Sequence, residues 1–178
     1  MAVERYDVNL RAADLSDLSL LRRWDEKSHV ITAKGADGED TSDTYCETEL
    51  ARHPVWRELL VAETDDRPIG LIQIIDPARE ETHYWGDVEQ NLRAIDVWIG
   101  EEEDLGRGYG SQMMRLALAH CFASQHVVSV LVDPLVSNER AHHFYRRLGF
   151  RLVDRRIFGT DDCFVYRLDR RDWQTGVS

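Results

Sequence analysis

A glycine-rich turn, Leu105-Gly106-Arg107-Gly108-Tyr109-Gly110, separates a segment typical of a strand from a helix with one apolar face. Glycines at alternate positions leave backbone N–H groups uncovered, and the first N–H groups of a helix have no partner within it. These donors and the helix dipole together favour a phosphate group. The turn lacks both the GxGxxG spacing and the Lys-Ser/Thr of a P-loop, which argues against NAD(P) and ATP. It predicts a pyrophosphate site, with a purely steric need for glycine as the alternative.

A second motif, N-x-x-A-x-x-x-Y-x-x-x-G-F, occupies residues 138–150. It follows Val127–Val132, a β-branched and leucine run typical of a strand buried on both faces. Ser137 or Asn138 is a suitable helix N-cap, and a glycine such as Gly149 commonly ends a helix. The pattern therefore predicts a strand, a helix to Leu148 and then a further strand.

The two motifs must be positioned by other strands and helices, and the apolar pattern of the remaining chain predicts where these lie. Strands are expected at 6–11, 59–63, 69–75, 94–99, 127–132, 150–158 and 163–168. Helices are expected after Asp14 (with Leu15, Leu18, Leu21 and Trp24 apolar), at 44–53, at 108–123 (with Tyr109, Met113, Leu116 and Ala117 on one face) and up to Leu148. The segment 27–43 is expected to be a loop, and 77–93 a polar insertion. This order describes one α/β (α+β) domain, residues 1–178, with a mixed sheet.

Together, the two motifs resemble motifs A and B of the GNAT superfamily of N-acetyltransferases, over about residues 95–150. The resemblance implies the GNAT fold, a mixed sheet of about seven strands with a splayed middle pair, flanked by helices. It also implies acetyl-CoA as co-substrate. One departure is Leu105, because the turn of the family usually begins with Gln or Arg. Since backbone amides do the binding, this departure is minor.

The family roles can be transferred to matching positions in this chain. Backbone groups of the strand at Val97, Trp98 and Ile99 would pair with the pantetheine arm. The amides of Arg107, Gly108, Gly110 and Ser111 would hold the pyrophosphate, and Asn138 would bond the pantetheine. Tyr145 would face the thioester sulfur. Its alternative role is to pack one face of the last long helix.

The chemistry that the resemblance implies suits two residues. A protonated amine is not a nucleophile, so a carboxylate must take its proton, directly or through water. A tyrosine can then donate a proton to the leaving thiolate, and each such step is worth roughly 10²–10⁴-fold. The resemblance makes Asp96 the first candidate for the base. A purely structural role is least expected for this residue, because it interrupts an apolar strand where an unpaired carboxylate would be costly. Tyr145 is the expected acid.

A closer resemblance, through Glu89–Asp96, Asp133-Pro134 and Trp24–Val30, is to aminoglycoside 6′-N-acetyltransferases. It implies an acceptor cleft that binds ammonium groups, with the 6′ amine as the acetylated position and antibiotic resistance as the outcome. The expected acceptor-binding residues are Glu89, Asp96, Asp133, Asp161 and Trp85. Each acidic residue also has an ordinary alternative, such as a strand end, a solvated loop charge or a bond to a neighbouring amide.

Another departure concerns the acceptor directly. The resembling enzymes place two tryptophans shortly after Ser-His, where this chain has Ala33-Lys34. Tyr84 and Trp85 either supply an aromatic wall instead or pack the insertion onto the sheet. The acceptor therefore stays open between an aminoglycoside and another amine, such as an N-hydroxylysine siderophore precursor, a polyamine or a protein N-terminus. An idle acyl-CoA sensor is the non-enzymatic alternative, which would not need both Asp96 and Tyr145.

Composition narrows the class further. The chain has 33 acidic and 22 basic residues, a net charge of −11, which argues against nucleic acid and favours a cationic ligand. Its three cysteines, Cys46, Cys121 and Cys163, lack metal-site spacing, and His142-His143 lacks further ligands, so no metal is expected. The sequence shows no signal peptide or membrane span, which predicts a cytoplasmic protein. It leaves monomer and homodimer open.

Overall fold

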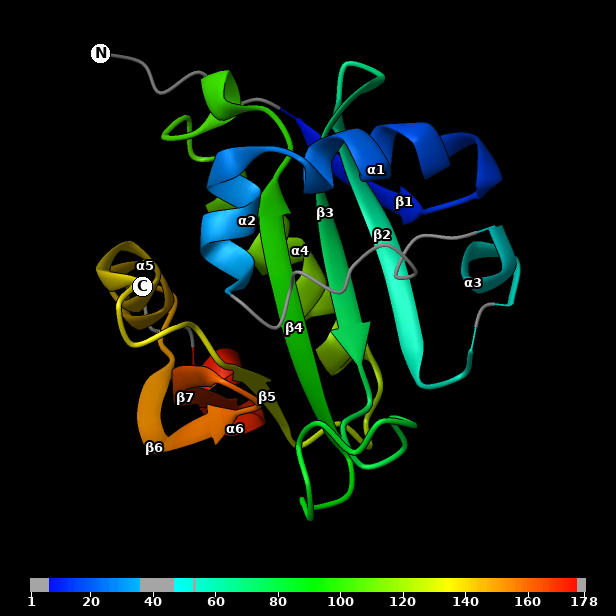
Figure 1. Cartoon of the computed structure of the whole chain (residues 1–178). Helices are drawn as coiled ribbons and strands as arrows, with labels where there is room; N and C mark the ends of the chain where they lie inside the picture. Colours follow the sequence, from blue (N-terminus) through cyan, green and yellow to red (C-terminus); the bar gives the residue numbers. More distant parts are fainter. Residues whose placement is uncertain (1–6, 36–46, 53, 176–178) are drawn as a thin grey trace.

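The computed structural model describes residues 7–35, 47–52 and 54–175, and a seven-stranded mixed sheet forms its centre (Figure 1). The strands lie in the order β1-β2-β3-β4-β5-β7-β6. Neighbouring strands are antiparallel apart from β4 and β5, which are parallel. Their bounds are β1 Val8–Ala12, β2 Arg57–Thr64, β3 Arg67–Ile75, β4 Leu92–Ile99, β5 Ser129–Val132, β6 Arg151–Phe158 and β7 Asp161–Asp169. The expected mixed sheet of about seven strands is confirmed.

Helices cover both faces of this sheet (Figure 1). On one face, α4 (Tyr109–Ala123) contributes fully buried Met113 and Ala117 to the largest apolar cluster. On the other face, α1 (Leu18–Asp25) contributes Leu21 and Trp24 to a second cluster. The other helical segments are η1 Leu15–Asp17, α2 Ser28–Lys34, α3 Glu47–Arg52, η3 Glu102–Asp104, α5 Glu139–Arg147 and α6 Arg170–Gln174. Among the described residues, no helix has the length and apolar character that a membrane crossing requires.

The two parallel strands separate along their length. β5 pairs with β4 only where Ser129–Leu131 lie beside Leu92–Ala94. Beyond that point β4 continues to Ile99 and stays paired with β3 on its other edge. Figure 1 shows the two strands diverging, with α5 on the side where β5 turns away. The splayed middle pair is thus present, and among the described strands none pairs with the β5-side edge of β4 from Ile95 onward.

Local capping signals explain where the first elements begin and turn. Asp14 caps η1 by accepting the backbone N–H of Ser16, and Asp17 returns a bond to the Asp14 N–H in a capping box. In the β2–β3 turn, Asp65 and Asp66 have φ of 50° and 60°, the left-handed conformation that two-residue hairpin turns require. The expected helix start and the expected hairpin are therefore confirmed.

Several sequence predictions were wrong in detail. Residues 28–34 were expected in a loop but form α2, whose Val30 is fully buried although most of the helix is polar. Leu15 and Leu116 were expected on buried faces but are 54% and 38% exposed, because Leu15 lies in η1 and Leu116 at the margin of the α4 stripe. The short α6 was not predicted. The expected helix 44–53 is described only as α3, with 44–46 and 53 outside the described residues.

Candidate active site

The glycine-rich turn presents open backbone at the start of α4. Gly106 and Gly108 have φ of 76° and 84°, and a Cβ added at either position would meet no atom within 4 Å. Positive φ explains why glycine is needed, and the open space leaves the neighbouring amides accessible. Gln112 donates to the Gly108 carbonyl at 3.3 Å, so the N–H groups of residues 109–111 precede the first bond of the helix. This geometry fits a bound phosphate group, as expected.

An ion pair has its buried member, Asp104, directly before this turn in the sequence: the Asp104 side chain is 2% exposed and that of Arg67 is 47% exposed. Asp104 accepts two hydrogen bonds from the Arg67 guanidinium, at 2.7 and 3.0 Å. Leu105 packs against the main core, which gives a structural reason for the leucine that departs from the family pattern. Sequence reasoning missed the pair, because nothing in the local pattern links a residue at the start of β3 with one 37 positions later.

Two carboxylates meet on the face of the sheet that carries α1 and α2. Asp96 lies on the same face of β4 as Ala94 and Trp98 and accepts a hydrogen bond from Gln73 Nε2 at 2.9 Å. Asp133, directly after β5, accepts one from the Tyr84 hydroxyl at 2.7 Å. Burial raises the pKa of Asp96, and burial together with the Asp96 charge raises the pKa of Asp133 to about 7. The pair therefore holds its protons more tightly than exposed aspartates do.

Tyr145 approaches these carboxylates from α5. Its ring is 8% exposed and packs between Phe150 and Tyr166, with centroids 5.6 and 6.4 Å away. Burial, followed by the negative charges of Asp96 and Asp133, raises the pKa of its hydroxyl. The phenol therefore stays protonated at neutral pH and lies within the field of both carboxylates. The sequence predicts Asp96, Asp133 and Tyr145 in one site, and in the structure the charges of the two aspartates act on the Tyr145 hydroxyl.

The helix α2 closes one side of this face. His29 Nε2 donates to the Ile99 carbonyl at 2.9 Å, which fixes the start of α2 to the end of β4. At the other end, Gly35 has φ of 86°, and a side chain there would collide with the carboxylate of Asp161 and with Leu135. The first residue of β7 thus lies against the end of α2. Asp161 is therefore close to Lys34 and Gly35, at the margin of the site.

Three other residues that the sequence pointed to, Trp85, Tyr84 and Glu89, have contacts of their own. Trp85 is 3% exposed and packs edge-on against Phe158, so it belongs to the core and does not form an aromatic wall. Of the two roles that the sequence left open for Trp85, the structure supports packing of the insertion onto the sheet. Tyr84, by contrast, is 43% exposed and stacks on Phe158 at 4.4 Å. Glu89 lies in an exposed ion pair with Arg167, at 3.1 Å.

Asn138 acts as the N-cap of α5. Its Oδ1 accepts the backbone N–H of Ala141 at 3.1 Å. The backbone of Val97, Trp98 and Ile99 lies on β4 beyond its pairing with β5, as expected for a strand edge that receives a ligand. The Ile99 carbonyl is, however, already occupied by His29.

His142, which belongs to the His142-His143 pair considered as metal ligands, has structural partners. His142 is 6% exposed, donates through Nε2 to the Val136 carbonyl at 3.0 Å and lies 3.2 Å from the Tyr166 hydroxyl through Nδ1. Within the described part of the chain, no group of three or more His, Cys, Asp or Glu side chains is arranged to hold a metal ion.

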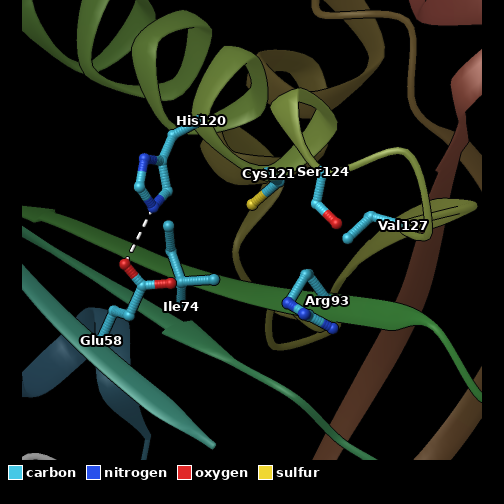
Figure 2. Close-up of a pocket in the computed structure, with 7 residues that line it drawn as sticks. All are labelled: Glu58, Ile74, Arg93, His120, Cys121, Ser124 and Val127. Atoms are coloured by element: carbon cyan, nitrogen blue, oxygen red, sulfur yellow. Dashed lines mark hydrogen bonds and ion pairs between the residues drawn. The ribbon is translucent and has the colours of Figure 1, made fainter. Parts of the chain in front are cut away.

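A pocket of about 220 Å³ lies elsewhere, between α4 and the sheet (Figure 2). Figure 2 shows His120 and Cys121 on α4 above Glu58 and Arg93, with His120 bonded to Glu58 at 2.8 Å. Ile74, Ser124 and Val127 complete its lining. Arg93 and Asp96 are separated by an odd number of positions on β4, so their side chains point to opposite faces of the sheet. The pocket therefore opens on the face opposite to that of the two carboxylates.

The fold and this arrangement define an acyltransferase of the GNAT type. The chain belongs to the acetyltransferase (GNAT) domain family, whose model matches residues 14–158. It is similar to aminoglycoside N(6′)-acetyltransferase type 1 of Klebsiella pneumoniae, with 27% identity over 149 residues, which cover 80% of this chain and 73% of that protein.

Two solved structures share the fold over most of the chain. Aminoglycoside acetyltransferase AAC(6′)-Ib in complex with coenzyme A superposes with a TM-score of 0.84 and 24% identity, covering 97% of this chain and 100% of that chain. Its complex with coenzyme A and kanamycin gives a TM-score of 0.84 and 23% identity with the same coverage. At these identities the likeness establishes the fold.

Proposed function

We propose that the chain transfers the acetyl group of acetyl-CoA to the 6′ amine of an aminoglycoside and thereby confers resistance to these antibiotics. The observation that carries the proposal is that the charges of Asp96, on β4, and Asp133, directly after β5, both act on the Tyr145 hydroxyl, next to the point where these strands diverge. Family membership supports the acetyl transfer. The names of the similar proteins, which act on or bind aminoglycosides, support the acceptor class.

The turn before α4 suits the pyrophosphate of acetyl-CoA. Amides of Arg107, Gly108, Gly110 and Ser111 would hold it, since the turn is exposed and glycine there leaves space for a ligand. The unpaired edge of β4 would hold the pantetheine arm by strand-like bonds. Because Oδ1 of Asn138 caps α5, its amide Nδ2 is the group we assign to the pantetheine.

The reaction proceeds by direct attack in this proposal. Asp96, directly or through water, takes a proton from the ammonium of the acceptor, and the neutral amine nitrogen attacks the thioester carbonyl carbon. A backbone N–H of β4 stabilises the oxyanion. As the tetrahedral intermediate collapses, the C–S bond breaks and the Tyr145 hydroxyl gives its proton to the leaving sulfur. The raised pKa of Asp96 makes its carboxylate a stronger base than an exposed aspartate, and the raised pKa of Tyr145 keeps the phenol protonated at neutral pH.

Acceptor binding would rest on carboxylates around this point. Asp96, Asp133 and Asp161 lie on the side closed by α2, where ammonium groups would gain from each negative charge. Glu89 has a lesser part, because its charge is exposed and already paired with Arg167. We therefore assign acceptor recognition mainly to the three aspartates.

The kanamycins provide a sharp test. Kanamycin B and kanamycin C differ only at the 6′ position, which carries an amine in the first and a hydroxyl in the second. Release of coenzyme A from acetyl-CoA is measured with each compound and with spermidine as a simpler polycation. We expect turnover with kanamycin B and none with kanamycin C, and the product should carry a single acetyl group on the 6′ nitrogen by mass spectrometry and NMR.

Each other outcome has a defined meaning. Equal turnover of kanamycins B and C would reject the 6′ position while keeping the acceptor class. Turnover of spermidine alone would reject the aminoglycoside and keep acetyl transfer to amines.

A further inference from the structure

Lys34, the last residue of α2, places an ammonium group inside the proposed acceptor site. Its Nζ forms an ion pair with Asp25 Oδ1 at the end of α1, and the side chains are 16% and 11% exposed. The same Nζ lies 4.5 Å from the ring centroid of Trp98. A carboxylate and the face of an indole ring are the two groups that bind an ammonium most favourably in proteins. Lys34 therefore fills a complete cation site.

This cation site adjoins the proposed base. Trp98 follows Asp96 by two positions on β4, so the two side chains lie on the same face. The positive charge of Lys34 acts on Asp96 and opposes the effect of burial on its pKa. The ammonium of Lys34 thus stands beside the point where the acceptor amine would lose its proton.

The surrounding contacts hold Lys34 in place. His29 fixes the start of α2 to the Ile99 carbonyl, and Gly35, directly after Lys34, lies against Asp161 and Leu135. The backbone on both sides of Lys34 is therefore anchored to the sheet. Two acidic groups act on this ammonium, Asp25 through the ion pair and Asp96 through its charge, and the carboxylate of Asp161 lies against the neighbouring Gly35.

We propose that Lys34 determines acceptor specificity by occupying, with its own ammonium, a cation site that a second ammonium of the acceptor would otherwise enter. This inference rests on the proposed function and deepens it. Acceptors with a neutral hydroxyl near the reacting amine fit beside Lys34, whereas acceptors with an additional ammonium there meet a like charge in a partly buried site. The protein should therefore prefer the less cationic members of the aminoglycoside class.

Kanamycins A and B test this preference, because both carry the 6′ amine and they differ only at the 2′ position, a hydroxyl in A and an amine in B. We expect the wild-type kcat/KM to be about tenfold higher for kanamycin A, the size of one partly screened charge interaction. Lys34→Gln removes the charge but keeps a donor for Asp25, and it should abolish or reverse the preference, mainly through the KM of kanamycin B. Lys34→Arg retains the charge and should keep the wild-type preference.

A double variant separates charge from packing. Asp25→Asn with Lys34→Gln removes both members of the ion pair, so the acceptor no longer finds the carboxylate that Lys34→Gln alone leaves without its lysine, and the gain for kanamycin B should be smaller than in Lys34→Gln. A wild type that prefers kanamycin B would overturn the inference without any variant. It would also be overturned if Lys34→Gln lowered kcat/KM for both compounds equally, as a merely structural lysine would. Absence of turnover with both kanamycins is a separate result, since it rejects the proposed function itself.

Discussion

The glycine-rich turn and the acceptor face, which is the sheet face that carries Asp96 and Asp133, use different groups to bind a ligand. The turn offers backbone N–H groups whose positions depend on two glycines with positive φ and on the neighbouring ion pair between Arg67 and the buried Asp104. The acceptor face offers side chains, Asp96, Asp133 and Lys34, whose charges depend on one another. The difference teaches that side-chain replacement should be tolerated on the surface of the turn and should alter chemistry on the acceptor face.

Replacement of the proposed base should have the largest effect. In Asp96→Asn the amide cannot accept the proton of the ammonium, so we expect kcat to fall roughly 10²–10⁴-fold while the KM for acetyl-CoA changes little. Steady-state kinetics with kanamycin A measure both values. Unchanged turnover would remove Asp96 from the mechanism, and a parallel loss of acetyl-CoA binding would contradict the separation of the two regions.

Loss of the proposed acid should cost less, because a thiolate leaves more easily than an amine. Tyr145→Phe keeps the buried ring and removes the hydroxyl, and we expect kcat to fall about 10- to 100-fold. The ring contacts with Phe150 and Tyr166 should be preserved, so the melting temperature serves as the control. If kcat is unaltered, Tyr145 has only the packing role.

On the turn, a change of backbone should matter more than a change of side chain. In Gly108→Ala the methyl group meets no protein atom, yet φ of 84° strains any residue with a Cβ, by about 1–2 kcal/mol. We expect the KM for acetyl-CoA to rise about tenfold because the amides shift, with little change in the KM for kanamycin A. Equal effects on both KM values would show that the turn also shapes the acceptor site.

The pH dependence of stability tests the carboxylate pair. Asp133 has a folded-state pKa of about 7, above the ordinary value of 3.8, so the folded protein binds more protons than the unfolded chain between these values and loses stability as pH rises through this window. Asp133→Asn removes this penalty. Thermal unfolding should therefore show a more favourable change in melting temperature on mutation at pH 8 than at pH 5. The same change at both pH values would mean that Asp133 does not titrate in this range.

The smallest effect is expected from Arg107, an exposed side chain in the middle of the turn. If its amide alone contributes, Arg107→Ala should alter the KM for acetyl-CoA less than about threefold, as is usual for an exposed, salt-screened charge. A larger, salt-dependent effect would show that the guanidinium also binds phosphate, and the contrast between backbone and side chain would then be weaker than described.

The backbone-built region was also the more predictable one. Glycines at alternate positions before a helix indicate a turn with positive φ, and α4 begins directly after such a turn, as the sequence predicts. Asp96 was found because a carboxylate within an apolar strand needs an explanation. Both are local signals that require no knowledge of distant residues.

Long-range pairings explain what the sequence could not predict. The helix α2 carries a run of β-branched residues and only one buried side chain, Val30, so its stability comes from docking, including the bond from His29 to Ile99. The Lys34–Asp25 and Arg67–Asp104 pairs join residues whose proximity arises only after folding. The sequence could not decide between the two roles of Trp85 for the same reason, because its partner Phe158 lies 73 positions later.

The order of the strands at the end of the sheet has a consequence for synthesis. β6 leaves the ribosome before β7, but β7 lies between β5 and β6 in the sheet and is the strand that pairs with β5. β5 must therefore wait for the last strand, and β6 and β7 join the sheet together as a hairpin. Asp161 and the support beneath Tyr84 arrive with that hairpin. A nascent chain that ends before β7 should already contain the glycine-rich turn and α4 but lack a finished acceptor site.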